Sequence, residues 1–241
     1  MIGAHTSVVS AKTLFDIHQG VRLGSDLFLV TKGFYERLDA DEREFFRPAV
    51  TNSSIIDGRL NRRTYVFYPY TLGLPHIKSE TQLSAAVPTF YSEVLRPAQS
   101  ALSARKSLKK ANQEWWGLIW PREWQFARKP KLTSKYFGDV GSLAWDDTGE
   151  FVVVVGHGWE PRVRGVETHK LAYNELPLAL VALFSSHVLA RLLSFHSVQV
   201  GGGQWDLSAK YVQELPIPAP TKANARVIRD LAELGDRITH G

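Results

Sequence analysis

Short apolar segments bounded by turn-forming residues constrain the fold of this 241-residue chain more than any other feature. Three of them occur early, at Thr13–Ile17, Asp26–Val30 and Tyr65–Tyr68. Apolar and β-branched residues enclosed in this way by Gly, Pro, Asn or Asp are typical of β-strands. The sequence therefore predicts a mixed β-sheet in this part of the chain.

Further strands are predicted at Gly117–Trp120 and Lys131–Ser134. The segments Ser142–Trp145 and Phe151–Val155 flank Asp146–Glu150, which is rich in turn residues. Such a turn between two apolar segments favours a β-hairpin. We therefore expect these two segments to pair with each other.

Helices are predicted where apolar residues recur every three or four positions. The predicted helices run from Asp39 as far as Pro48, over 79–112 with interruptions at Pro88 and Pro97, from Pro177 to His196, from Ser208 for a short distance, and from Lys222 to Ile238. The expected fold class is α+β, with a twisted mixed β-sheet and a helical support. Residues 1–170 form the β-rich part, which includes the helical insertion at 79–112, and residues 171–241 form the helical part.

The composition, with 44% hydrophobic and 22% charged residues, is that of a folded globular protein. The absence of cysteine excludes disulfides and thiolate zinc sites and agrees with a cytoplasmic location. The first ten residues lack the pattern of a secretory signal. The apolar run 176–193 contains Pro177, two serines, His187 and Arg191, so it predicts a buried amphipathic helix and no membrane span.

The formal net charge of +5 is modest, but its distribution is uneven. Nine cations cluster between positions 105 and 135, opposed there only by Glu114 and Glu123: Arg105, Lys106, Lys109, Lys110, Arg122, Arg128, Lys129, Lys131 and Lys135. A phosphate-contacting face requires such clustering, although a solvated face remains the alternative for the lysines at 106–110. The cations from position 122 onward are the stronger candidates because they lie near four tryptophans, most of which we expect in the core: Trp115, Trp116, Trp120 and Trp124.

The segment 201–218 combines a Gly-Gly-Gly entry, a short amphipathic stretch and a Pro-Ile-Pro exit. Other landmarks precede it in a fixed order: the Gly-containing segment Leu14–Val30, Tyr65–Tyr70, Trp115–Arg122 followed by Lys129–Leu132, and the apolar helix Leu178–His187. From about Leu14 to Pro218 the chain thereby resembles the TaqI-like C-terminal specificity domain, or target-recognition domain, of adenine-specific DNA methyltransferases and bifunctional restriction-modification enzymes. It departs from the family at Phe184-Ser185-Ser186, where Leu-Asn-Ser is more common, which weakens any role assigned to that end of the helix.

The resemblance implies sequence-specific recognition of double-stranded DNA, with chemistry performed by a separate methyltransferase catalytic domain or subunit. That partner would bind S-adenosylmethionine and flip an adenine out of the duplex, and no cofactor is expected on this chain. The apolar helix and the C-terminal helix, with Val227, Leu231, Leu234 and Ile238 on one side, are the expected docking surfaces. The alternative is a structural or protein-interaction module that has kept the fold and lost DNA binding.

Candidate base contacts lie in loops. Arg reads guanine and Asn reads adenine through paired hydrogen bonds, so the loop with Arg59, Asn61, Arg62 and Arg63 has suitable chemistry, with solvated loop arginines as the alternative. Arg22 and Ser25 in the first Gly-containing loop, and Gln204 beside the three glycines, complete the set. The predicted DNA-binding residues are Arg22, Ser25, Arg59, Asn61, Arg62, Arg63, Lys109, Arg122, Arg128, Lys129, Lys131 and Gln204.

No catalytic or metal-binding residue is predicted. An adenine methyltransferase needs an Asn/Asp-Pro-Pro-aromatic motif, and the chain contains no Pro-Pro pair. The strand-like Val152–Val155 leads into Gly156-His157-Gly158, but Pro161 follows too soon for the helix that a cofactor loop requires, so we expect a plain turn. Neither the Asp/Glu-x-Lys motif of a nuclease nor the His spacing of a zinc site occurs, and His187 and His196 are expected to be structural.

Overall fold

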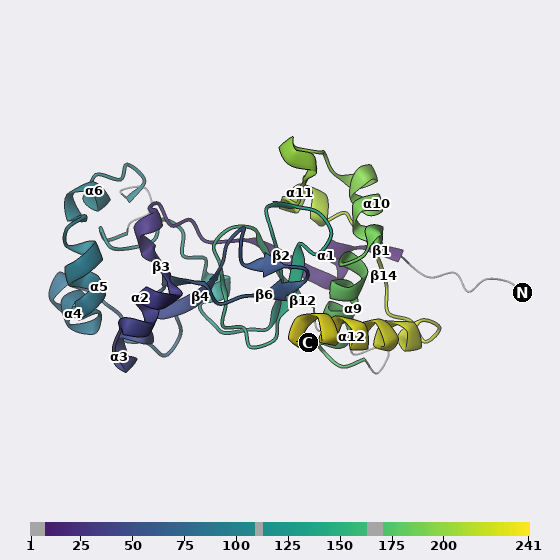
Figure 1. Cartoon of the computed structure of the whole chain (residues 1–241), viewed down its shortest axis with the longest axis horizontal. Helices are drawn as coiled ribbons and strands as arrows, with labels where there is room; N and C mark the ends of the chain where they lie inside the picture. Colours follow the sequence, from purple (N-terminus) through teal and green to yellow (C-terminus); the bar gives the residue numbers. More distant parts are fainter. Residues whose placement is uncertain (1–7, 109–112, 163–170) are drawn as a thin grey trace, which may run out of the picture.

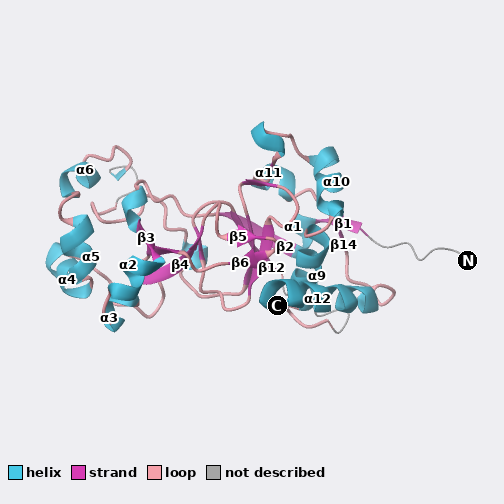
Figure 2. Ribbon diagram, viewed as in Figure 1, coloured by secondary structure: helices cyan, strands magenta, loops and turns pink. Residues whose placement is uncertain are grey.

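The computed structural model describes residues 8–108, 113–162 and 171–241. The molecule is elongated, with helices gathered at both ends and strands between them (Figures 1 and 2). Each end has its own apolar core, and we call the two ends the amino lobe and the carboxy lobe. The α+β fold class predicted from the sequence is confirmed.

The amino lobe is built on a mixed sheet with strand order β11-β4-β7-β3. Its strands are β3 (Leu29–Thr31), β4 (Phe46–Val50), β7 (Thr64–Phe67) and β11 (Val152–Val153). Strand β7 pairs antiparallel with β3 and β4, whereas β11 runs parallel to β4. The strand predicted at Tyr65–Tyr68 is therefore confirmed, whereas Asp26–Phe28 forms a 3-10 turn ahead of β3.

Short helices cover this sheet: α2 (Lys32–Arg37), α3 (Ala40–Arg43), α4 (Glu80–Ala86), α5 (Pro88–Phe90), a π-turn (Tyr91–Leu95) and α6 (Gln99–Ser103). The Ser79 hydroxyl caps α4 by accepting from the Gln82 N–H at 3.2 Å, and Pro88 opens α5. The predicted helical insertion is thus confirmed as far as Ser103, and residues 109–112 lie outside the described residues. The helix expected after Asp39 ends at Arg43, and Pro48 lies inside β4.

The carboxy lobe contains an antiparallel sheet with strand order β10-β8-β12-β2. Its strands are β2 (Phe15–Gln19), β8 (Lys131–Ser134), β10 (Leu143–Asp146) and β12 (His157–Pro161). Trp159 is fully buried at the centre, opposite Leu132 on β8 and Ile17 on β2, and meets the edge of Phe15 at 6.0 Å. The strand predicted at Thr13–Ile17 begins two residues later, because Thr13 and Leu14 belong to helix α1 (Ala11–Leu14).

Short ribbons extend this architecture within the described residues: β1 (Val8–Ser10) with β14 (Pro216–Pro218), β5 (Ile55–Ile56) with β6 (Arg59–Leu60), and β9 (Phe137–Gly138) with β13 (Trp205–Asp206). The segment Gly117–Trp120, predicted as a strand, is irregular and contributes only a bridge between Trp120 and Arg22.

The predicted hairpin around Asp146–Glu150 is wrong. Strand β10 pairs with β8 in the carboxy lobe, whereas β11 pairs with β4 in the amino lobe. The intervening turn therefore connects two sheets. Turn-forming residues fix where a strand ends, but they do not decide which strand it joins.

The helices of the carboxy lobe are α9 (Glu175–Phe184), α10 (His187–His196), α11 (Ala209–Val212) and α12 (Ala225–His240). The apolar helix α9 is almost entirely buried and packs along α12. Among the described residues no single helix is long and apolar enough to cross a membrane. The pair α9 and α10 passes that test only when taken together, and the two helices meet at 85°.

The carboxy-lobe core draws residues from both sides of position 170. Phe15, Trp145 and Trp159 pack in one cluster with Leu180 and Ile228. The helical part at 171–241 is thus buried against strands from 15–161, while the boundary at 170 stays a prediction.

Candidate nucleic-acid interface

The first Gly-containing loop is held against the loop that contains Trp120. The Arg22 N–H donates to the Trp120 carbonyl at 3.0 Å, and the Trp120 N–H donates to the Arg22 carbonyl at 3.1 Å. Trp120 is 44% exposed and Arg22 is exposed as well, so an aromatic face and a cation lie side by side on the surface. The Ser25 hydroxyl accepts from the Leu27 N–H at 3.3 Å, a local capping bond that fixes the loop.

Arg122 also holds these two loops together. Its Nε donates to the Gly20 carbonyl at 3.1 Å and its Nη2 donates to the Gln19 Oε1 at 3.0 Å. Its backbone φ is 64°, which is uncommon for a residue with a side chain, and the Tyr68 hydroxyl fixes this backbone by donating to the Pro121 carbonyl at 2.5 Å. The guanidinium is half-buried, so Arg122 both shapes the loop and presents a cation.

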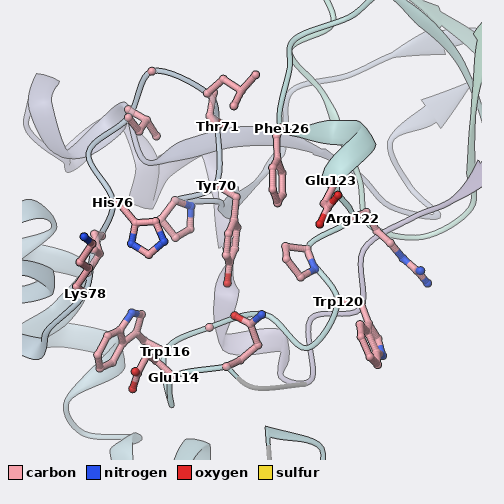
Figure 3. A pocket seen from close by; sticks show the side chains of 18 of the residues that line it. Tyr70, Thr71, His76, Lys78, Glu114, Trp116, Trp120, Arg122, Glu123 and Phe126 are labelled. Atoms are coloured by element: carbon pink, nitrogen blue, oxygen red, sulfur yellow. The ribbon is translucent and has the colours of Figure 1, made fainter. Parts of the chain in front are cut away.

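An aromatic cleft of about 1020 Å³ opens beside these loops in the amino lobe (Figure 3). Tyr70 and Phe126 stack in its wall with ring centroids 5.8 Å apart and planes 11° apart. The Tyr70 hydroxyl accepts from the Leu118 N–H at 2.8 Å, and burial raises the pKa of Tyr70 to about 12, so the phenol stays neutral. Figure 3 shows Trp116 and His76 on the opposite side of the cleft and Arg122 pointing away from its middle.

The rim of the aromatic cleft carries charges of both signs. Lys78 and Arg122 are cationic, and Glu114 and Glu123 are anionic. The flat rings can stack on a planar group, and among the described residues that line the cleft no nucleophile is hydrogen-bonded to a base. Among the described residues, no group of three or more His, Asp or Glu side chains is arranged to hold a metal ion.

The ribbon β5–β6 presents the predicted base-reading loop. Asp57 and Gly58 at its tip have φ values of 48° and 79°, the left-handed pair that a tight two-residue hairpin requires. The Asn61 amide donates to the carbonyls of Ser53 and Ser54 at 2.8 and 3.1 Å, and its Oδ1 accepts from the Arg63 N–H at 3.3 Å. Asn61 is therefore engaged in closing the loop.

The arginines of this loop differ in their surroundings. Arg62 forms a 2.5 Å ion pair with Glu150 and lies over the Phe151 ring at 5.2 Å. Arg59 and Arg63 are exposed, and their side chains form no hydrogen bond or ion pair with the described residues. Arg59 and Arg63 are thus the loop's available cations.

The predicted cations between positions 128 and 131 differ in burial. Arg128 and Lys129 are exposed, and the Lys129 Nζ lies 4.0 Å from the Glu160 Oε1. Lys131, which we expected to contact phosphates, is instead 3% exposed, with its Nζ 2.6 Å from the Asp146 Oδ2. All four residues of β8 are buried, so both faces of the strand are covered and the Lys131 ammonium cannot reach a phosphate in this structure.

The remaining predicted residues lie apart from this region or outside it. Lys109 is outside the described residues. Gln204 is exposed next to Gly201–Gly203, in the carboxy lobe. The structure therefore groups Arg22 with Arg122, groups Arg59 with Arg63, and places Gln204 elsewhere.

Two arginines outside the predicted set have defined structural positions. Arg105, part of the basic cluster, donates to the carbonyls of Leu23, Trp115 and Gly117 at 2.7 to 3.2 Å, and burial lowers its pKa. Arg47 is 1% exposed in β4. The only sequence signal for Arg47 was a single charge inside an apolar strand, Phe46–Val50.

Searches with family models and against curated proteins give no match. Solved structures do match. The type IIL restriction-modification enzyme MmeI, in a structure in complex with DNA, aligns with a TM-score of 0.58 and 14% identity over 97% of this chain and 29% of that enzyme. The type IIG restriction endonuclease BpuSI aligns with the same TM-score and identity over 95% of this chain and 26% of that enzyme. The chain thus has the fold of a part, less than a third in length, of these enzymes.

Proposed function

We propose that this chain recognises double-stranded DNA as part of a restriction-modification or related anti-phage system. The observation that carries the proposal is the similarity in fold, over nearly the whole chain, to a portion of an enzyme solved in complex with DNA. The exposed arginines support it: Arg22, Arg59, Arg63 and Arg128 present cations that form no ion pair with the described residues. Unpaired surface cations of this kind are what contacts to DNA phosphates and bases require.

At finer detail, we propose a TaqI-like specificity domain that positions an adenine for methylation. The catalytic step and S-adenosylmethionine belong to a separate domain or subunit, and this chain acts in the cytoplasm without catalytic residues of its own. The half-exposed Trp120 beside Arg22 and Arg122, with the ribbon β5–β6, provides the contact surface.

Selection from a pool of random duplexes tests this proposal. The purified chain is bound to the pool at 50 and 200 mM salt, and the bound fraction is sequenced. We expect a short enriched motif, with affinity falling about a hundred-fold between the two salts if about four phosphates are neutralised. Failure to bind duplex DNA at 50 mM salt would contradict the proposal.

Arg59 and Arg63 provide the variant test. We expect R59A and R63A each to weaken binding to the selected motif by about 1–3 kcal/mol where the arginine reads a base, and to relax the preference at that position. Arg226 is an exposed arginine on α12 that belongs to no proposed contact, so R226A serves as the matched control and should bind as the unaltered chain does. Equal losses on specific and random duplexes would assign the arginine to phosphate contact.

A protein-interaction module is the second candidate, and the surface of α10 favours it. Phe195 is 73% exposed on this helix, and Val188 is 43% exposed. On α12, Leu231 and Ile238 pack on the core while Val227 and Leu234 are about half exposed, so only part of the expected docking face is available. Binding to a protein partner that changes little with salt, together with no DNA binding, would favour this candidate.

A further inference from the structure

A cavity of about 280 Å³ in the amino lobe is lined by arginines from separate parts of the chain. Arg43 comes from α3, Arg47 from β4, Arg62 from the segment after β6 and Arg128 from the loop before β8. At about 30 Å³ per water molecule, this volume holds a small tetrahedral anion together with several waters. The cavity is distinct from the aromatic cleft.

Arg47 is the innermost of these residues and is 1% exposed. Its Nε donates to the Glu150 carbonyl at 2.8 Å, its Nη1 to the Gln125 carbonyl at 2.7 Å and its Nη2 to the Gly149 carbonyl at 2.7 Å. These bonds use three of the five guanidinium N–H groups and leave two. Among the described residues, no carboxylate lies within 4.0 Å of it, although a buried charge is normally paired.

The charges around the cavity do not cancel. Four arginines and two glutamates, Glu44 and Glu150, line the cavity, which is an excess of two formal positive charges. Glu150 is engaged by Arg62 at 2.5 Å, and Glu44 is exposed to solvent. The Arg128 guanidinium forms no hydrogen bond or ion pair with the described residues, so its donors are available at the mouth of the cavity.

We propose that this cavity is a phosphate-binding site, in which Arg128 grips the anion while the buried Arg47 and Arg62, which stays paired with Glu150, add positive charge. Planar guanidinium groups match phosphate oxygens with paired hydrogen bonds, which makes arginine suited to such a site. The phosphate comes either from a DNA backbone or from free phosphate. Its assignment to DNA rests on the proposed function, whereas the site itself does not.

The experiment titrates the full chain with inorganic phosphate at constant ionic strength and follows binding by isothermal calorimetry and phosphorus NMR line width. We expect saturable millimolar binding to the unaltered chain, a loss of at least ten-fold in R128A, and no change in R226A. Absence of saturable binding to the unaltered chain, or equal binding to R128A and the unaltered chain, would overturn the proposal.

A variant that binds phosphate more tightly provides a second test, because misfolding could explain a loss of phosphate binding but not a gain. E150Q keeps a hydrogen-bond acceptor for Arg62 but removes the negative charge, so we expect phosphate to bind several-fold more tightly. Unchanged or weaker binding in a folded E150Q would count against the electrostatic argument.

Duplex DNA separates the two sources of phosphate. If the site holds a backbone phosphate, R128A should reduce the slope of log affinity against log salt by about 0.9, the contribution of one phosphate contact. An unchanged slope together with lost inorganic phosphate binding would support the site with free phosphate as its ligand. Failure of the chain to bind any DNA would overturn the proposed function. The titration with inorganic phosphate would then still decide whether the cavity binds phosphate.

Discussion

At the scale of single residues, the buried pair of Lys131 and Asp146 fixes the turn between the two sheets. The Asp146 carboxylate also accepts from the Phe151 N–H at 3.1 Å and from the Thr148 hydroxyl at 3.0 Å. Burial lowers the pKa of Lys131, and the adjacent carboxylate opposes this by favouring the charged ammonium. The pair therefore holds the chain at the point where it passes from one sheet to the other.

We expect K131M to destabilise the protein by about 3–5 kcal/mol, because it leaves a carboxylate buried without its cation. Urea unfolding measures this change in the free energy of unfolding. K129M, which alters a neighbouring exposed lysine, should stay within about 0.5 kcal/mol of the unaltered chain. The double variant K131M/D146N should recover part of the loss, and a cost below about 1 kcal/mol for K131M alone would contradict the role of the pair.

His157 makes stability depend on pH. It is 2% exposed, stacks on Tyr136 at 5.6 Å, and burial lowers its pKa from 6.5 to about 4. Between these values the unfolded chain binds a proton that the folded chain does not, so stability falls as the pH drops from 6.5 toward 4. We expect this residue to account for about 2 kcal/mol of the stability lost between pH 7 and pH 5.

Urea unfolding of H157Q at both pH values checks this expectation. Other groups titrate in the same range, so the informative quantity is the difference between the two proteins in their loss of stability. H157Q should lose about 2 kcal/mol less than the unaltered chain. Equal losses would show that His157 is protonated in the folded protein at pH 5.

At the scale of elements, the sequence located most strands and helices but not their partners. Apolar patterning placed β7, β8 and the helical insertion well, because each depends on local periodicity. The pairing of β10 with β8 and of β11 with β4 depends on contacts between distant segments, which local turn chemistry does not encode. The serines at 185 and 186 interrupt the apolar pattern, but a local pattern does not show that α9 and α10 meet there at 85°.

In the candidate site too, the sequence predicted local properties of residues but not the contacts between distant ones. The sequence identified Arg59, Arg63 and Arg128 as cations on loops, and the structure finds them exposed. It could not show that Lys131 is buried, because the burial of β8 depends on strands that are distant in the sequence. Nor could it bring Arg47 to the same cavity as Arg128, since the two are separated by eighty positions of chain.

Packing between α9 and α12 gives a prediction for Gly235. An alanine in an exposed helix interior is about 1 kcal/mol more favourable than glycine. A Cβ at Gly235, however, would lie 1.9 Å from the Leu178 carbonyl oxygen, a backbone atom that cannot rotate away. We therefore expect G235A to destabilise by about 1–3 kcal/mol in urea unfolding, whereas E233A on the exposed face should be close to neutral. A stabilised G235A would mean that the two helices separate easily.

At the scale of the whole molecule, the chain passes repeatedly between the lobes and its crossing segments bond to one another. The Gly20 N–H donates to the Gly156 carbonyl at 3.0 Å, and the Val21 N–H donates to the Val153 carbonyl at 2.8 Å. A Cβ at Gly20 would lie 2.6 Å from the Val153 carbonyl oxygen, so this close approach requires glycine. The lobes are thus joined by interleaved segments of chain.

We expect the fragment 171–241 to lack cooperative folding when produced alone. Its helices would expose the apolar side chains that Phe15, Trp145 and Trp159 cover in the full chain. Circular dichroism during urea unfolding, compared with the full chain, provides the measurement. A single sharp transition in the fragment would show that the helical part is an independent domain.

The closure of the β5–β6 ribbon by Asn61 has a consequence for how such a protein can change over generations. The loop is held by bonds from one amide to the main chain of Ser53, Ser54 and Arg63, and main-chain groups are the same whatever side chain they carry. Substitutions of the Arg59 and Arg63 side chains therefore leave these bonds, and the main-chain conformation that they hold, unchanged. The side chains displayed at this edge of the molecule can therefore change in the course of evolution without loss of the stable fold.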